Sequence, residues 1–312
     1  MRVLVAGATS ALGTSLVQQL VSHGHHVLGV TSRRGSLLRP GSHGTYGSAV
    51  TEIVADVRDR RSVLDAVEGR SADAVVNLLG AHGSYPAGFR GMRAVNRLRH
   101  EGTSTMVAVA SAVGATRLVG TSSFYGYGFA DHGDESLDET RPFGEPDDSR
   151  NDALQIGLTS SEQQVRAVGG IVLRLGHLYR FGAHSVPPVA RRWSGSLPVV
   201  HIDDAARAAL LSLDAGNDRD IFNIASARPT SWRMLQEAQS KVDGFARPVA
   251  LPDSVVRKLA PFASQLITRT SMRLTTEAAR AKLGWTPQHP SIDSVLESVL
   301  PANMTAAVGG PA

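Results

Sequence analysis

Near its N-terminus the chain reads Arg2-Val3-Leu4-Val5-Ala6-Gly7-Ala8-Thr9-Ser10-Ala11-Leu12-Gly13. The apolar run before the first glycine predicts a buried strand, and the apolar spacing from Leu12 to Val21 predicts a helix directly after it. A glycine-containing turn between a strand and a helix lets backbone N–H groups approach a pyrophosphate. A tight turn without a ligand is the alternative, but this position in an α/β chain favours a dinucleotide. The predicted contacts are Gly7, Thr9, Ser10, Ala11, Leu12 and Gly13.

Strand and helix patterns alternate through the first two thirds of the chain. Further strands are predicted at residues 26–31, 52–55, 73–79, 117–121 and 170–175, and a long helix at 93–113. Strands that are apolar on both faces and separated by helices predict a Rossmann-type, doubly wound parallel sheet. We therefore expect an α/β fold.

The predicted organisation has two parts. Residues 1–175 form a cofactor-binding domain, to which a later strand returns within 199–224, and residues 176–312 form a smaller, mostly helical substrate-binding subdomain. The glycine- and serine-rich stretch 35–48 is predicted to be a loop, and residues 301–312 a disordered tail.

Composition excludes several classes of protein. The chain has 312 residues, 42% hydrophobic and 19% charged, which argues against a mainly disordered protein. It has no cysteine, so disulfides, thiolate catalysis and cysteine-bound metals are excluded. Without a long apolar run or a secretory segment we expect a cytoplasmic protein with no membrane partner.

Basic and metal-binding residues show no clustering in the sequence. The 32 basic residues are scattered, so no nucleic-acid partner is expected. The eleven histidines include no His-x-x-x-His pair, so no metal site is predicted. The expected partner is a small molecule, and the expected state is a monomer or a homodimer.

The turn spacing Gly7…Ser10…Gly13 resembles the Gly-x-x-Gly-x-x-Gly turn of short-chain dehydrogenases/reductases, with Ser10 in place of the middle glycine. Further segments resemble the extended, epimerase/dehydratase-like branch of that superfamily. They are Asp56-Val57, Asn77-Leu78-Leu79-Gly80, Thr121-Ser122-Ser123-Phe124-Tyr125-Gly126, residues 174–179, 200–205 and 274–287. The resemblance implies that Asp56 and Val57 contact adenine, and that Leu78, Leu79, Gly80 and Thr121 lie beside the cofactor. His82, in the loop after the fourth predicted strand, is a further candidate cofactor contact.

The end of the second predicted strand points to the cofactor. It reads Thr31-Ser32-Arg33-Arg34, without the acid that NAD-specific folds place there. Guanidinium groups bind a 2′-phosphate in a charge-assisted, forked geometry. A solvated basic loop is the alternative, but the position favours NADP (NADPH) over NAD.

The resemblance also implies a catalytic tyrosine with a lysine four residues later, and a Ser or Thr at the end of the fifth strand. Thr121 takes the Ser/Thr place, and Glu162 matches a glutamate that often follows the lysine by four positions. That register puts Leu154 at the tyrosine and Leu158 at the lysine, and residues 128–178 contain neither residue type. The dyad is absent.

Three functions remain open. The first is an NADPH-dependent ketoreductase with substrate-assisted protonation, acting on an aromatic polyketide, as a resemblance to angucyclinone ketoreductases of actinomycete antibiotic pathways implies. The others are a non-enzymatic NADP-binding regulator and a sugar-nucleotide epimerase or dehydratase. Candidate catalytic residues are Thr121, Ser122 and His177, and candidate substrate contacts are Ser84, Tyr85, Ser123, Tyr125 and His177.

Overall fold

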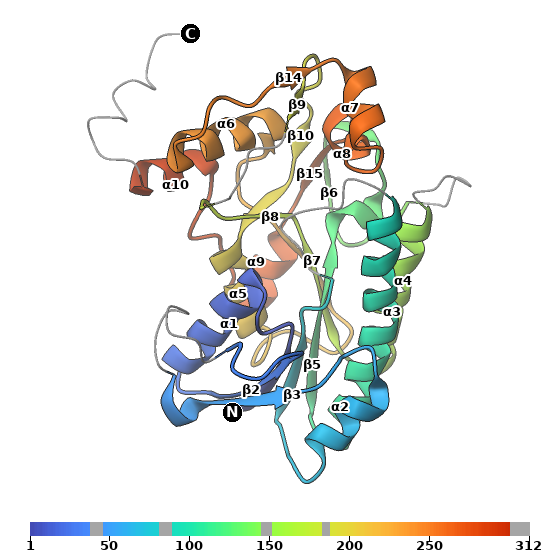
Figure 1. Cartoon of the computed structure of the whole chain (residues 1–312), viewed down its shortest axis with the longest axis vertical. Helices are drawn as coiled ribbons and strands as arrows, with labels where there is room; N and C mark the ends of the chain where they lie inside the picture. The colour runs from blue at the N-terminus through green and yellow to red at the C-terminus, as the bar shows by residue number, and fades with distance from the viewer. Residues whose placement is uncertain (38–45, 81–88, 145–151, 183–187, 300–312) are drawn as a thin grey trace.

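Seven parallel strands form the central sheet of the computed structural model, in the order β12-β7-β5-β4-β1-β2-β3 (Figure 1). They are β1 (Arg2–Ala6), β2 (His26–Thr31), β3 (Val50–Val54), β4 (Ala74–Asn77), β5 (Arg117–Ser123), β7 (Ile171–Leu175) and β12 (Ile221–Ile224). The structure describes residues 1–37, 46–80, 89–144, 152–182 and 188–299. Because all the pairings in this sheet are parallel, the strands present their carboxyl ends along one edge. The predicted Rossmann-type sheet is confirmed.

The strand order reverses at the centre of the sheet. The chain runs from β1 outward to β3 and then returns, so that β4 pairs with the other side of β1. A ligand site is expected at such a reversal, outside the carboxyl ends of the strands. The six strands that the sequence predicts lie where expected, each end within two residues.

Helices cover both faces of the sheet. On one face lie α1 (Ala11–Ser22), α5 (Ile202–Leu211) and α9 (Glu277–Leu283), and on the other α2 (Arg60–Val67), α3 (Phe89–Ala112) and α4 (Asp152–Ala167). Helix α1 buries Leu12, Leu16 and Leu20 on one stripe, at the spacing of an amphipathic helix, against the valines of β1. Figure 1 shows α3 and α4 side by side along the sheet.

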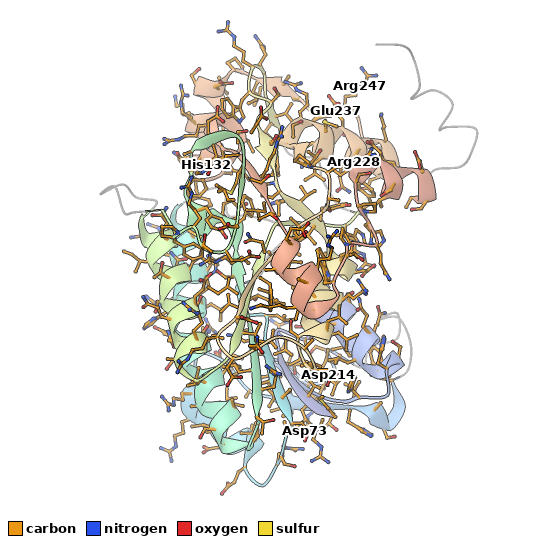
Figure 2. The ribbon with its side chains drawn as sticks, turned by 180° about the vertical axis from the view of Figure 1, so that it is seen from behind. Asp73, His132, Asp214, Arg228, Glu237 and Arg247 are labelled. Carbon is orange, nitrogen blue, oxygen red and sulfur yellow. The ribbon has the colours of Figure 1, made fainter. Side chains whose placement is uncertain are left out.

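The remaining elements surround a second apolar core beyond the carboxyl edge of the sheet. They are the helices α6 (Trp232–Asp243), α7 (Asp253–Leu259), α8 (Ala263–Arg269) and α10 (Ile292–Val299), the 3-10 turn at Phe124–Tyr127, and the paired short strands β6 (Asp131–Leu137) with β15 (Ser271–Leu274), β8 (His177–Tyr179) with β11 (Val199–His201), β9 (Val189–Ala190) with β14 (Ala250–Leu251), and β10 (Ser196–Leu197) with β13 (Thr230–Ser231). A second 3-10 turn, Gly47–Ala49, lies elsewhere, directly before β3. Seen from behind, Arg228 and Glu237 mark this end of the molecule and Asp73 the opposite end (Figure 2).

Segments beyond residue 175 contribute to both parts of the molecule. Strand β12 lies beside β7 in the central sheet, and α9 packs on the same face as α5. The boundary at residue 175 stays a prediction, and the predicted tail at 301–312 falls outside the described residues. None of the helices in the described ranges combines the length and apolarity that spanning a bilayer requires.

Candidate functional site

The side chain of Ser10 holds the turn after β1 in shape. Its Oγ donates to the Gly7 carbonyl (2.8 Å) and accepts from the Gly13 backbone N–H (3.0 Å), which makes Ser10 the N-cap of α1. A serine cap satisfies one of the free N–H groups at the start of a helix. The serine in place of the middle glycine therefore fastens this turn from within.

Two glycines are required in the turn, one for its backbone conformation and the other for lack of space. Gly7 has φ +84°, a left-handed conformation that favours glycine. A Cβ on Gly13 would lie 2.1 Å from the Gly7 carbonyl oxygen and 2.7 Å from the Ala8 backbone. Gly7 also faces Leu78, since a Cβ there would lie 3.4 Å from the Leu78 Cβ. This bare, close-packed backbone at the start of α1, beside the end of β4, fits the pyrophosphate of a dinucleotide.

The loop after β2 is supported by a residue that the sequence does not single out. The Glu52 carboxylate on β3 accepts from the backbone N–H groups of Gly35 (2.6 Å) and Leu37 (2.7 Å). Arg33 and Arg34 are exposed, and among the described residues neither forms an ion pair with a carboxylate. The two guanidinium groups of this loop are therefore open to an anion.

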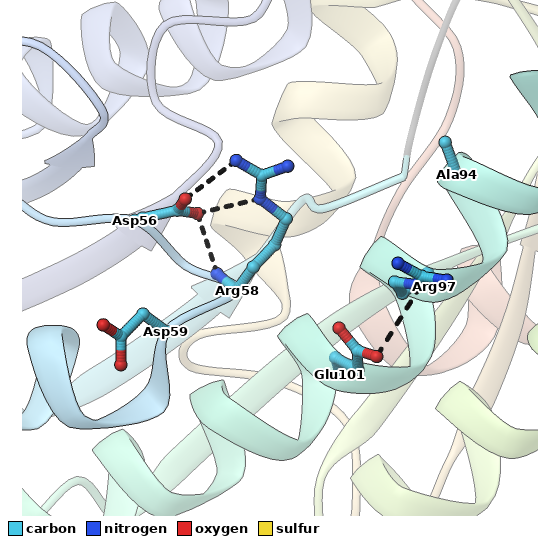
Figure 3. Close-up of a pocket in the computed structure, with 6 residues that line it drawn as sticks. All are labelled: Asp56, Arg58, Asp59, Ala94, Arg97 and Glu101. Atoms are coloured by element: carbon cyan, nitrogen blue, oxygen red, sulfur yellow. Dashed lines mark hydrogen bonds and ion pairs between the residues drawn. The ribbon is translucent and has the colours of Figure 1, made fainter.

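A pocket of about 400 Å³ lies beyond β3, between the segment at 56–59 and α3 (Figure 3). Asp56 and Arg58 form a forked pair on its wall, with Nε to Oδ1 at 3.0 Å and Nη2 to Oδ2 at 2.8 Å. These hydrogen bonds from Arg58 hold the pKa of Asp56 below its ordinary value. Both carboxylate oxygens of Asp56, the residue predicted to contact adenine, thus accept hydrogen bonds from Arg58. The guanidinium group of Arg58 lines the same pocket.

The ends of β4 and β5 are joined by polar side chains. Thr121 Oγ1 on β5 donates to the Asn77 carbonyl (3.1 Å), and Asn77 Nδ2 donates to Thr103 Oγ1 on α3 (3.0 Å). The buried Arg99, also on α3, donates to the Gly80 carbonyl at 3.0 Å. The sequence predicts Thr121 and Gly80 at this edge. It does not predict Arg99, because nothing in the pattern of its helix shows that this side chain reaches the end of β4.

Two hydroxyl groups at the end of β5 are buried among the described residues without accepting or donating a hydrogen bond there. Ser122 Oγ and Ser123 Oγ have no hydrogen-bond partner among the described residues. Buried hydroxyls without a partner are uncommon and call for an explanation such as a bound ligand. Tyr125, two residues further on, is buried against Phe124 and Phe129 and contributes to the apolar wall here.

Helix α4 carries apolar residues where the resembling family has its dyad. Leu154 lies in the helix, and Leu158 is fully buried in the second core. One turn further along, Glu162 forms a buried forked ion pair with Arg174 of β7 (3.1 and 2.9 Å). Arg174 also donates to Tyr127 Oη at 2.9 Å. This network fixes the register of α4 against the sheet and so keeps Leu158 in its place.

His177 follows β7 and is buried against Trp232, with the two rings in an edge-to-face contact (centroids 5.4 Å apart). Burial lowers the pKa of His177 to about 4. The ring is therefore neutral at pH 7 and has no proton to give as an imidazolium acid. Contact between this neutral ring and a substrate remains compatible with its position. His82, Ser84 and Tyr85 lie outside the described residues.

Comparisons with known proteins agree with this architecture. The profile of the NAD dependent epimerase/dehydratase family matches residues 3–179. A 3-diazoavenalumate denitrifying reductase from a Streptomyces species is 31% identical over 93% of this chain and 97% of its own length.

Two solved structures show the same fold. A dTDP-glucose 4,6-dehydratase from Streptomyces venezuelae, with NAD and TYD bound, superposes with a TM-score of 0.73 at 19% identity, over 96% of each chain. A human epimerase family protein with NADPH superposes with a TM-score of 0.69 at 19% identity, over 96% of this chain and 99% of its own.

Proposed function

We propose, from the premise that the chain belongs to the NAD dependent epimerase/dehydratase family and is an oxidoreductase, that it is an NADPH-dependent reductase. Its substrate, in this proposal, needs no proton from the enzyme. The observation that carries this proposal is α4, where the fully buried Leu158 stands at the dyad's lysine position. General acid catalysis contributes typically 10²–10⁴-fold, and an enzyme without it must act on a reactive acceptor.

The cofactor choice rests on the loop after β2. NADPH would lie with its pyrophosphate on the Gly7–Gly13 turn and its 2′-phosphate near Arg33 and Arg34, whose guanidinium groups have no carboxylate partner among the described residues. When bound, it supplies a hydride at the carboxyl edge of the sheet. Thr121, Ser122 and Ser123 are at that edge, where they would orient a polar atom of the substrate.

One candidate substrate is a ketone of an aromatic polyketide. Hydride adds to the carbonyl carbon, and the oxygen takes a proton from solvent to form the alcohol. An aryl or quinonoid ketone delocalises the developing negative charge over its ring, so the Thr121 hydroxyl would have to supply only a hydrogen bond, by turning its proton from the Asn77 carbonyl to the substrate oxygen. The second apolar core beyond this edge contains the buried Tyr125 and the partly buried Trp232, and aromatic side chains of this kind suit a flat ring system.

A second candidate substrate is an aryl diazo compound. It is favoured by the 3-diazoavenalumate denitrifying reductase, whose sequence matches this chain over nearly the whole length of both proteins. Hydride replaces the diazonium group of such a compound: a C–H bond forms, the C–N bond breaks, and dinitrogen leaves with the bonding electrons. No proton is consumed. An active site without a general acid is suited to this chemistry.

The test is anaerobic NADPH oxidation, followed by absorbance, with aryl ketones, aryl diazo acids and sugar nucleotides as separate panels. Products are identified by mass spectrometry, and deuteride from 4-deuterated NADPH locates the new C–H bond. We expect turnover with one of the aromatic panels and incorporation of one deuterium. Tight NADPH binding without oxidation would favour a regulator, and turnover of sugar nucleotides alone would favour an epimerase or dehydratase.

Variants at the site extend the test. Thr121→Ala should slow turnover by the loss of one hydrogen bond, about 1–3 kcal/mol in the barrier. Tyr125→Phe should have a smaller effect. A loss of about 10⁴-fold in either variant would identify a dedicated acid, because that is the top of the range for general acid catalysis.

A further inference from the structure

Two histidines and an aspartate from distant parts of the chain meet beside α5. His201 ends β11, Asp203 lies in the first turn of α5, and His289 lies between α9 and α10. One nitrogen or oxygen atom from each residue lies within 4.8 Å of the others. The two imidazole rings are in contact and tilted, with centroids 4.0 Å apart and an interplanar angle of 32°. We propose that these three residues, none of which belongs to the predicted nucleotide site, form a zinc site whose function does not depend on the proposed reductase activity.

The hydrogen bonds of His289 leave one of its nitrogens available to a metal. Its Nδ1 lies 3.1 Å from Asp204 Oδ2, and the same carboxylate accepts from the backbone N–H groups of Gln288 and His289, each at 2.8 Å. A carboxylate that already accepts two N–H groups makes Nδ1 the protonated nitrogen, so Nε2 carries a lone pair. Metal-binding histidines are typically oriented by a carboxylate on the other nitrogen in this manner.

His201 and Asp203 are also suitably oriented. His201 Nδ1 accepts a long hydrogen bond from the Asp203 backbone N–H (3.3 Å), so this nitrogen is unprotonated and could exchange that weak bond for a metal. Asp203 Oδ1 accepts from Ser15 Oγ on α1 (2.6 Å). The second oxygen, Oδ2, lies 3.6 Å from His201 Nδ1. Ser15 therefore positions the carboxylate just as Asp204 positions the imidazole of His289.

The donor set selects the class of metal. Two imidazoles and one carboxylate suit zinc and its first-row neighbours, whereas magnesium and calcium prefer oxygen alone. Zinc bonds of about 2.0–2.1 Å bring neighbouring ligand atoms to about 3.3 Å from one another. His201 Nδ1 and Asp203 Oδ2, 3.6 Å apart, are already near that spacing. The Asp203 side chain is 49% exposed, so an ion can reach the cluster from solvent while Ser15 holds the other carboxylate oxygen.

A metal here would join three segments of the fold. Asp203 is tied to α1 through Ser15, His201 belongs to the β8–β11 pair, and His289 belongs to the segment that leads into α10. The ion would fasten this C-terminal segment to the helices of the Rossmann core. Since binding to the folded state alone shifts the unfolding equilibrium, the melting temperature should rise with zinc concentration.

The experiment uses full-length, tag-free protein treated with EDTA and then dialysed. Titration with zinc chloride by calorimetry should give one saturable equivalent and a rise in melting temperature. Cobalt(II) should give the visible absorption of an ion bound to imidazole. We expect His289→Gln and Asp203→Asn each to weaken zinc binding at least tenfold, with unchanged circular dichroism in the absence of metal.

The matched control tests a second group of potential zinc ligands near the N-terminus. There the N-terminal amine lies 3.3 Å from His25 Nδ1, and His26 is the next residue. The double variant His25→Gln with His26→Gln should bind zinc as the native protein does. The absence of a saturable equivalent in the native protein, or binding lost in this control and retained in Asp203→Asn, would overturn the proposal. Should His289→Gln fail to fold, the Asp203→Asn titration and the cobalt spectrum decide.

Discussion

Replacing His177 by glutamine should change how the stability of the protein depends on pH. The imidazole is buried against Trp232, and its pKa is lowered from 6.5 to about 4 by burial. Between pH 4 and 6.5 the unfolded chain binds a proton here that the folded chain does not. The folded state therefore loses stability as the pH falls below 6.5, and the loss levels off below about pH 4.

The size of this effect follows from the two pKa values. For pKa values of 6.5 and about 4, proton linkage lowers the free energy of unfolding by about 1.3 kcal/mol between pH 7.5 and 5.5. The full loss at lower pH is about 3 kcal/mol, from about 1.4 kcal/mol for each pH unit separating the two values. Glutamine does not titrate in this range, so the variant should lack this contribution while it keeps those of all other groups.

The assay is urea unfolding of both proteins at pH 7.5 and 5.5. The native protein should lose about 1.3 kcal/mol more than His177→Gln between the two pH values, whatever the absolute stability of the variant. Equal losses would refute the reasoning and restore His177 as a candidate acid. If the variant does not fold, an NMR titration of His177 in the native protein replaces it, and a pKa near 6.5 would then be the contradicting result.

Three other perturbations are predicted. Gly13→Ala should abolish measurable NADPH binding by calorimetry, because its Cβ would meet backbone at 2.1 Å; unchanged affinity would place the cofactor elsewhere. Arg33→Ala with Arg34→Ala should weaken NADPH binding at least tenfold more than NADH binding in a fluorescence titration, and equal losses would contradict the assignment of the 2′-phosphate. Glu162→Gln should lower the free energy of unfolding by about 3–5 kcal/mol, because it leaves the Arg174 guanidinium buried without its carboxylate; a loss below about 1 kcal/mol would show that water reaches the pair.

The positions of the sheet strands and the nucleotide-binding turn follow from the sequence because both are local. Apolar runs that alternate with helical patterns locate β1 to β5 and β7, and the glycine at the end of β1 predicts a turn whose φ of +84° few other residues adopt. The absence of Tyr and Lys from residues 128–178 is likewise visible in the sequence alone. Only the geometry of α4, fixed by Glu162 and Arg174, shows that Leu158 fills a buried position there.

Other features depend on which distant atoms meet when the chain closes. Asp56 resembles an adenine contact in the sequence, yet in the folded chain it is bound to Arg58. His201 and His289 have no spacing that would identify them as a pair, although their rings are in contact in the structure. The hydrophobic pattern of a segment records which of its faces is buried, and this is set by the segment itself. The partner of a buried polar atom is set by the packing angles and loop lengths of the whole fold, so it is decided by the tertiary structure alone.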